Sequence, residues 1–270
     1  MTLDVISAPT GYPLALGAVK DHLRVDGAAE DDYITGLMAG AASYAEGFIW
    51  RALLTRTLDL VLDAFPAVIR PPLPPLRSVT SITYIDTAGA SQTLAASKYQ
   101  VDAKAEPARI KPAYGEVWPG TRAVYNAVTV RYKAGLLTPF TASSSTDIIT
   151  AAGHPYADTD VLRLSHSGDQ GEALPAGLAV NTDYYARDVT AGLSLKVAAT
   201  SGGAAIDITD GGTGTHYLGT MPEPVRRAML LVIGDWYANR ETIVIGVAVA
   251  TLPKVTAADH LLFTERNHLG

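Results

Sequence analysis

The sequence contains no cysteine among its 270 residues, which excludes disulfide frameworks, thiolate metal sites and cysteine nucleophiles. It also lacks any apolar run approaching the roughly 20 residues that span a bilayer, and no basic segment precedes an apolar one at its start. We therefore expect no membrane partner and an intracellular origin. Apolar residues make up 48% and charged residues 18% of the chain, a composition that excludes disorder and predicts a packed core.

A basic excess is missing as well. The net charge is −6, and residues 137–220 hold nine acidic and three basic residues, which leaves 18 of each sign elsewhere. Proteins that grip nucleic acid through its phosphates need a surplus of Lys and Arg, so we expect no sequence-specific DNA binding. The uneven charge also divides the chain. We predict a discontinuous core of residues 1–136 and 221–270 and an inserted acidic domain of residues 137–220.

Apolar spacing predicts four helices, at about residues 16–23, 31–49, 221–241 and 256–264. In the second, Asp31 and Asp32 stand at the positive end of the helix, where acidic side chains cap it. Its three glycines lower helix stability by up to about 1 kcal/mol each, so we expect close neighbours on their side. These glycines are Gly36, Gly40 and Gly47.

Alternating residues predict strands in the core at about 57–63, 79–86 and 126–135, with residues 97–102 as the return strand of a hairpin. Beyond them, a stretch rich in Ser and Thr at 137–147 predicts an exposed connection. Short alternating runs then follow, among them Ile206 and Ile208, separated by glycine-rich turns. The fold class is therefore α+β: a small helical bundle with a short antiparallel sheet or hairpin, plus an inserted all-β sandwich or barrel domain.

A proline cluster stands directly before the strand at 79–86. Pro72, Pro75 and Arg77 fit the PxxP-plus-cation pattern that SH3-type domains bind. Prolines also mark the entry of edge strands, because they cannot donate to a β-ladder. We favour the second interpretation, since β-branched residues follow at once.

Other polar patterns carry weaker signals. The six histidines lack zinc-site spacing, so we expect them on the surface or in loops. Ser165, His166 and Asp169 adjoin in sequence, whereas catalytic triads come from distant segments. The glycine-rich residues 209–216 lack the lysine and helix of a phosphate loop. Four aspartates offer oxygen ligands for calcium without an EF-hand pattern. They are Asp158, Asp160, Asp207 and Asp210. We predict no catalytic, cofactor or metal site.

The succession of several segments resembles the head-to-tail connector (adaptor) proteins of long-tailed bacteriophages and prophages. The stretches that carry the likeness are "LGAVKDHLRVDGAAEDDYITGLMAGAASYAEGFIWRAL", the prolines before "RSVTSITYID", "YQVDAKAEPARIKPAYGEVWP", "NAVTVRYKAG" and "PEPVRRAMLLVIGDWYANRE". Where the family has a short loop, this chain has the acidic β-module of residues 137–220.

The resemblance implies a non-enzymatic structural subunit that forms a ring of about twelve copies by a closing head-to-tail interface. Such a ring lies under the portal protein in the virion neck, contacts tail-side neck, stopper or tail proteins, and passes genomic DNA without sequence readout. Assembly takes place in the bacterial host cytoplasm. The module is free to contact the capsid. An alternative function is a β-rich adhesion or glycan-binding virion protein in which the module binds.

The C-terminal region carries one candidate contact site. Leu261, Leu262 and Phe263 form an apolar triplet close to the end of the sequence. Such a triplet left exposed marks an interaction surface. We therefore expect these three residues to contact the portal or a neighbouring subunit.

Overall fold

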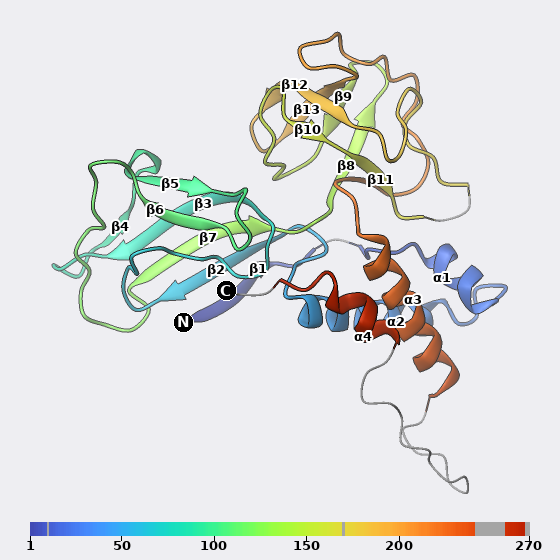
Figure 1. Cartoon of the computed structure of the whole chain (residues 1–270), viewed down its shortest axis with the longest axis horizontal. Coiled ribbons are helices and arrows are strands. Elements are labelled where there is room, and N and C mark those ends of the chain that lie inside the picture. The colour runs from blue at the N-terminus through green and yellow to red at the C-terminus, as the bar shows by residue number, and fades with distance from the viewer. Residues whose placement is uncertain (10, 169–170, 241–256, 268–270) are drawn as a thin grey trace, which may run out of the picture.

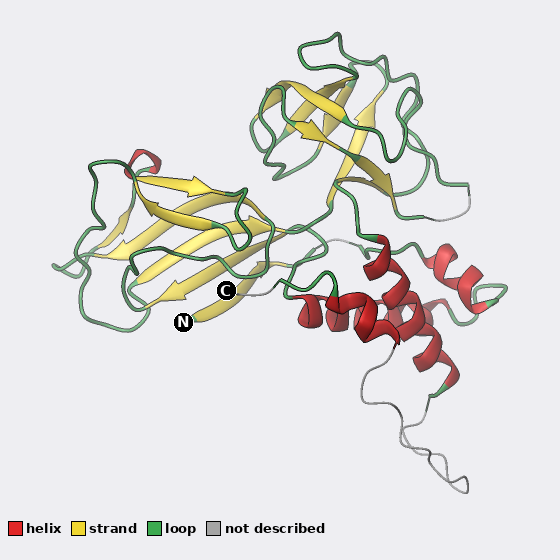
Figure 2. Cartoon of the chain, in the orientation of Figure 1, coloured by secondary structure: helices red, strands yellow, loops and turns green. Residues whose placement is uncertain are grey.

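The computed structural model describes residues 1–9, 11–168, 171–240 and 257–267. These residues form three lobes: a group of helices, a five-stranded sheet and a barrel-like seven-stranded sheet (Figure 1). Figure 2 shows the α-helices gathered in one lobe and the strands in the other two. The mixed α and β composition predicted from the sequence is confirmed. No described helix is long and apolar enough to cross a membrane.

The helices pack around one apolar core. Their bounds are α1 (Leu16–Leu23), α2 (Asp31–Ile49), α3 (Glu223–Ala238) and α4 (Ala257–Phe263). α2 and α3 supply most of the buried side chains, and Leu262 of α4 completes the cluster. All four helices predicted from apolar spacing are confirmed. Asp31 and Asp32 lie in the first turn of α2 as predicted, but neither forms a side-chain cap hydrogen bond. Asp31 instead pairs with Lys20, whose Nζ lies 2.7 Å from the carboxylate.

The prediction of close neighbours at the three α2 glycines is confirmed at one position, Gly40. A Cβ placed on Gly40 would lie 3.0 Å from the ring of Trp236, so α3 approaches α2 closely there. At Gly36 and Gly47 nothing lies within 4 Å of the same position. Both of these glycines are exposed. The expectation of neighbours at Gly36 and Gly47 is therefore wrong within this chain.

The second lobe is an antiparallel sheet with strand order β1-β2-β7-β3-β4. Its strands are β1 (Thr2–Ser7), β2 (Arg56–Leu62), β3 (Leu76–Ile85), β4 (Ser91–Thr93) and β7 (Val128–Ala134). The predicted alternation in β7 is confirmed, since Val128, Val130 and Tyr132 are all buried. Of the two predicted alternatives, a short antiparallel sheet or a hairpin, the structure has the sheet, and β1 enlarges it by adding to the edge of β2.

The predicted hairpin partner is wrong. β3 pairs with β4 through Thr83 and Thr93, whereas residues 97–102 contribute to a separate two-stranded sheet. That sheet consists of β5 (Tyr99–Asp102) and β6 (Arg109–Pro112). A 3-10 turn, η1 (Ala96–Lys98), lies between β4 and β5. This turn ends the segment that follows β4. The next strand, β5, pairs with β6 and not with β3.

The third lobe is a seven-stranded sheet with strand order β10-β12-β13-β9-β8-β14-β11. Its strands are β8 (Thr138–Ser143), β9 (Ile148–Thr150), β10 (Val161–Leu162), β11 (Leu164–His166), β12 (Tyr184–Thr190), β13 (Ser194–Ala198) and β14 (His216–Leu218). Only Arg163 separates β10 from β11, which lie at the two ends of the strand order. The sheet therefore curls into a nearly closed barrel around its own apolar cluster.

Two expectations for this lobe are wrong. The Ser/Thr-rich stretch at 137–147 is no exposed connection, since it contains β8 and buries Phe140. The alternating Ile206 and Ile208 form no strand, and the Ile208 N–H donates to the Asp147 carboxylate at 2.9 Å. A side chain thus takes the donor that a strand ladder would use.

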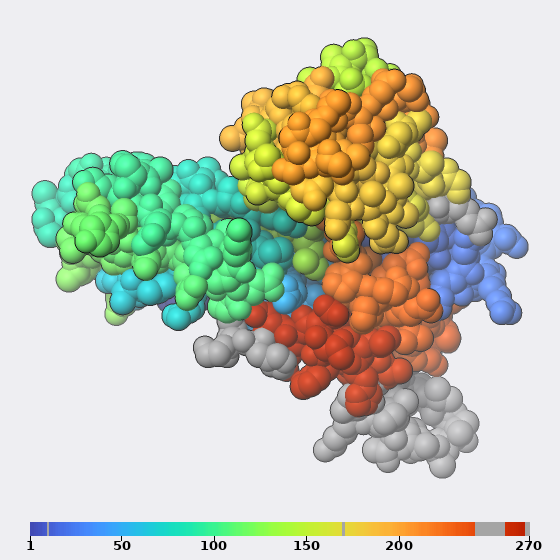
Figure 3. All heavy atoms as spheres, turned by 45° about the horizontal axis from the view of Figure 1, so that its top comes forward, coloured from blue at the N-terminus to red at the C-terminus, as the bar shows by residue number. Residues whose placement is uncertain are grey.

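Figure 3 shows the barrel lying against the other lobes, beside the α1 region and the start of α3. Two backbone carbonyls join barrel and core. The Tyr217 hydroxyl donates to the Tyr12 carbonyl at 2.9 Å, and the Ala15 N–H donates to the Ser167 carbonyl at 3.2 Å. The barrel is therefore docked on the core, and the division at residues 137 and 220 stays a prediction.

Candidate functional site

The predicted contact triplet lies on α4, and its three side chains have different surroundings. Leu262 is fully buried in the helical core, and Leu261 is half-buried against the same cluster. Phe263 is 56% exposed. Because Leu262 is needed inside the chain, the predicted contact with a portal or neighbouring subunit now depends mainly on Phe263. That contact stays a prediction.

Polar contacts hold α4 and the residues after it against α2. The Tyr44 hydroxyl donates to the Asp259 carboxylate. Burial and this carboxylate together raise the pKa of Tyr44 to about 12. The Asn267 N–H donates to the Ile49 carbonyl at 2.9 Å, and the Arg51 Nε donates to the Glu265 carbonyl at 3.1 Å. Phe263 is therefore presented from a fixed position.

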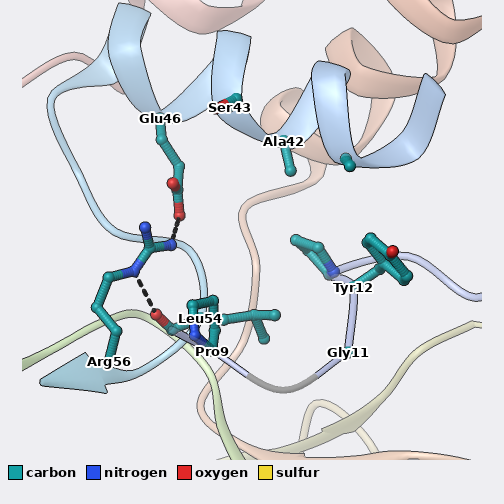
Figure 4. Close-up of a pocket in the computed structure, with 10 residues that line it drawn as sticks. Pro9, Gly11, Tyr12, Ala42, Ser43, Glu46, Leu54 and Arg56 are labelled. Carbon is teal, nitrogen blue, oxygen red and sulfur yellow. Dashed lines mark hydrogen bonds and ion pairs between the residues drawn. The ribbon is translucent and has the colours of Figure 1, made fainter. Parts of the chain in front are cut away.

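A pocket of about 340 Å³ lies between α2 and the segment before α1 (Figure 4). Its charged groups are Glu46 and Arg56, which form an ion pair. The same Glu46 carboxylate accepts a hydrogen bond from the Leu53 N–H at 2.7 Å, and Arg56 Nε donates to the Leu54 carbonyl at 3.4 Å. Both side chains thus fix the turn from α2 to β2.

Arg77 is used inside the protein, which excludes the recognition-peptide interpretation. Its guanidinium donates to the Gly135 and Leu136 carbonyls. The prolines beside it are engaged as well: Pro72 accepts a hydrogen bond from the buried Tyr132 hydroxyl at 2.9 Å. An SH3-type partner would need this cation and these prolines on a free surface. The cluster is therefore the entry of strand β3. The entry to a strand is as favoured from the sequence, but the expected edge position is wrong, because β3 lies between β7 and β4.

One histidine contradicts the expectation of surface or loop positions: His216 is buried in β14, whereas His154 is in a loop as expected, although it is also buried. His154 and His216 are 2% and 4% exposed. His154 Nε2 lies 3.2 Å from the Thr190 and Ser194 carbonyls, and burial lowers the pKa of this imidazole. His216 Nε2 lies 3.0 Å from the Ala173 carbonyl. Both rings therefore tie loops of the barrel together. Within the described ranges no group of three or more His, Asp or Glu residues is placed to hold a metal ion.

The Ser165–His166 pair is not arranged for catalysis. Ser165 Oγ donates to the Gly219 carbonyl at 2.7 Å, and His166 Nδ1 lies 3.3 Å from Glu172. Serine and histidine thus have separate partners. Asp169, the third residue of the sequence pattern, lies outside the described residues.

Three of the four candidate calcium ligands cap turns of the barrel instead. Asp158 accepts from the Val189 N–H at 3.1 Å, and Asp160 accepts from the Ala157 N–H at 2.8 Å. Asp210 accepts from the N–H groups of Ala176 and Gly212, both at 2.8 Å, and these bonds lower its pKa. The glycine-rich residues 209–216 therefore direct two of their amides to carboxylates of this chain, Gly212 to Asp210 and Thr215 to Glu172, so these two amides are not available to an anion of the kind weighed from the sequence.

Two chain connections join barrel and core, and we call them the junction. It comprises residues 135–137, where the chain leaves the core, and 219–221, where it returns. Leu54, Leu137 and Tyr217 form a buried cluster beside it. Thr55 Oγ1 and Thr138 Oγ1 lie 2.9 Å apart. Sequence reasoning missed this site because its partners are far apart in the chain: Thr55 and Thr138 are separated by 83 positions.

These observations define a class: a mixed α and β chain of three lobes with a built junction between barrel and core. No protein-family model and no curated protein match the chain. Solved structures do match. A chain in the neck of an empty GTA particle, determined with C6 symmetry, aligns with a TM-score of 0.54 at 16% identity, covering 99% of this chain and 96% of that one.

Two further structures give the same result. A chain in the virion of a native gene transfer agent (GTA) particle aligns with a TM-score of 0.55 at 16% identity. A chain in the neck of a native GTA particle, determined with C12 symmetry, aligns with a TM-score of 0.54 at 14% identity. Both alignments cover 99% of this chain and 96% of the other. The likeness shows a shared fold, and its span takes in the barrel.

Proposed function

We propose that this protein is a structural subunit of the neck of a phage-like particle, where it forms a ring under the portal and leaves a channel for DNA. The observation that carries the proposal is the fold shared over 99% of the chain with proteins from GTA necks. The sixfold and twelvefold symmetry applied to those necks supports a ring of about twelve copies. The ring is a scaffold without catalytic activity.

The contacts of such a ring follow from its position in the virion. Portal protein lies on one side and tail-side neck, stopper or tail proteins on the other. The barrel is available to reach the capsid. The charge outside residues 137–220 is balanced, so DNA passes without sequence readout.

Electron microscopy of the purified protein, alone and mixed with portal protein, tests the proposal. We expect closed rings of about twelve copies that stack coaxially on the portal. Mass photometry of the same samples gives the copy number independently. A protein that stays monomeric and leaves the portal bare at every mixing ratio contradicts the proposal.

The contribution of α4 needs a separate variant. Phe263→Ala removes the exposed aromatic ring without touching the buried Leu262. Leu231→Ala is a matched control, since Leu231 is 43% exposed on α3. We expect Phe263→Ala to weaken portal binding or ring closure about tenfold and Leu231→Ala to leave both unchanged. Equal behaviour of the two variants removes Phe263 from the interface without affecting the ring proposal.

A further inference from the structure

Arg77 on β3 lies beside both chain connections of the junction. Its guanidinium donates from Nε to the Gly135 carbonyl and from Nη2 to the Leu136 carbonyl, in the connection that leads to the barrel. The returning connection passes nearby, since a Cβ placed on Gly219 would lie 3.4 Å from Arg77 Nη2. One side chain of the core thus binds the chain where it enters the barrel and lies beside it where it comes back.

Gly219 shows how tightly the two connections are packed. Its φ of +104° suits glycine, and a Cβ there would lie 2.2 Å from the Leu136 carbonyl oxygen. The Gly219 N–H donates to the Arg163 carbonyl at 2.9 Å, and its own carbonyl accepts from Ser165 Oγ. The returning connection is therefore held by the barrel on one side and by the entering connection on the other.

A side chain of the barrel lies near Arg77 as well. Burial lowers the pKa of the Arg77 guanidinium, and the nearby Tyr156 hydroxyl partly offsets this effect. Tyr156 packs against the apolar cluster of the barrel, and its ring stacks on His154 with the ring centroids 6.2 Å apart. Arg77 on β3 therefore binds the entering connection and lies beside the returning connection and a side chain of the barrel.

The chemistry of this arrangement requires arginine. Burial lowers the pKa of the Arg77 guanidinium, so placing a cation here is unfavourable unless its donors are satisfied. A guanidinium is a rigid planar fork whose donors reach two neighbouring carbonyls at once, whereas a lysine ammonium is a single point on a flexible stem. Two donors directed at consecutive carbonyls fix the direction in which the chain leaves β7.

We infer that Arg77 is a positioning residue that locks the barrel at one orientation relative to the five-stranded sheet. Without it the connections remain covalently intact, but the contact between sheet, junction and Tyr156 is lost. The barrel then keeps its other contacts with the core, among them Tyr217 with Tyr12, but its orientation varies more widely about residues 135–137 and 219–221. The inference concerns the single chain and does not depend on the proposed ring.

The absence of cysteine makes a direct measurement possible. Spin labels are attached to Ala88→Cys, in the exposed turn between β3 and β4, and to Ser201→Cys, in an exposed turn of the barrel. Pulsed electron paramagnetic resonance then measures the distance distribution between the lobes, with a large excess of unlabelled chain so that each assembly holds one labelled copy. We expect a single narrow distribution for the parent protein.

Arg77→Met keeps the length of the side chain and removes its donors. We expect it to widen the distance distribution by about twofold or more, because both charge-assisted hydrogen bonds are lost. Arg70→Met is the matched control, since Arg70 is exposed a few residues earlier, and it should leave the distribution unchanged. Arg77→Lys should give an intermediate width, which a purely volume-filling role would not.

Two outcomes overturn the inference. One is an Arg77→Met protein that is folded by circular dichroism and has the parent distribution. The other applies if Arg77→Met fails to fold. The same distance measurement is then made on Tyr156→Phe, a variant that removes only the hydroxyl near Arg77 and keeps the ring in the barrel core. A parent-like distribution for Tyr156→Phe in that case contradicts the lock.

Discussion

The five-stranded sheet and the barrel are both antiparallel, yet they are built in opposite ways. The central strands of the sheet are long, with ten residues in β3 and seven in β7, and its edges at β1 and β4 are open. The barrel uses strands as short as two residues, and it curls so that β10 and β11 are linked through a single residue. Open edges carry unpaired backbone groups, whereas closure removes them.

The difference also appears in what holds each lobe together. The sheet depends on alternating apolar side chains around the buried Tyr132. The barrel depends more on its turns, where carboxylates such as Asp147 and Asp210 bind backbone amides. The negative charge of residues 137–220 is thus partly structural. The sheet and the barrel have separate apolar clusters. We therefore expect a core substitution in one lobe to destabilise that lobe without destabilising the other.

Ile149→Ala in the barrel and Ile82→Ala in the sheet are a matched pair, because both side chains are fully buried. We expect each to lower the free energy of unfolding of its own lobe by about 2–5 kcal/mol. Tryptophan emission separates the two, since Trp50, Trp118 and Trp236 all lie outside residues 137–220. Ile82→Ala should shift the tryptophan midpoint in urea, and Ile149→Ala should shift only the circular dichroism of the barrel.

A tryptophan midpoint that falls by the same amount in both variants would show one cooperative unit. The docking of Tyr217 on Tyr12 and the buried Leu54, Leu137 and Tyr217 cluster are the contacts that could produce such coupling. In that case the predicted boundaries at residues 137 and 220 are wrong as folding boundaries.

The sheet contains an ion pair whose carboxylate is buried. Asp59 is 7% exposed and accepts two hydrogen bonds from Arg131, at 2.8 and 2.7 Å. Arg131→Met leaves this carboxylate without them and should lower sheet stability by roughly 2 kcal/mol. Arg109→Met breaks the exposed Asp102–Arg109 pair and should cost less than about 1 kcal/mol. Similar urea midpoints for both variants would contradict the burial argument.

The barrel should be the more acid-sensitive lobe. Burial lowers the pKa of His154 from its ordinary value of 6.5, so below that pH the unfolded chain binds the proton more readily than the folded chain. Stability is therefore complete above about pH 6.5 and falls as the pH decreases through that value. His154→Gln keeps an amide donor for the Thr190 and Ser194 carbonyls and should reduce this loss.

Barrel melting temperatures at about pH 7.5 and pH 5.5 give the comparison. His22→Gln, on the exposed side of α1, serves as the control and should behave like the parent protein. An acid-induced loss that is the same in parent and His154→Gln would assign the sensitivity to other groups.

The sequence predicted the elements whose pattern repeats over several turns or alternations. α2 holds helical spacing over 19 residues, and β7 alternates over seven, so tertiary packing reinforces what each segment favours alone. β4 has only three exposed polar residues and carries no such pattern. The alternation at Ile206 and Ile208 was misleading, because the carboxylate of Asp147 competes for a backbone donor.

The candidate site was less accessible to sequence reasoning than the fold. Arg77 was singled out in the sequence because prolines precede it. Its hydrogen-bond acceptors, however, are backbone carbonyls some 60 residues away in the chain, such as that of Leu136. Backbone acceptors have no residue signature, so no spacing rule could find them. Gly219 also carries no sequence signal, because glycine is required there only by the close approach of the two connections in the folded chain.

The smallest expected effect concerns the three glycines of α2, in the helical lobe, two of which face open space while one packs against α3. Gly36→Ala and Gly47→Ala add a methyl group into open space and should each stabilise the helical lobe by about 0.5–1 kcal/mol, because alanine restricts the unfolded chain. Gly40→Ala should destabilise, since its Cβ would lie 3.0 Å from Trp236. Tryptophan midpoints in urea at low protein concentration measure all three. A loss of stability at Gly36 or Gly47 would mean that this face of α2 is covered, and repeating the titration at ring-forming concentration shows whether a second copy covers it.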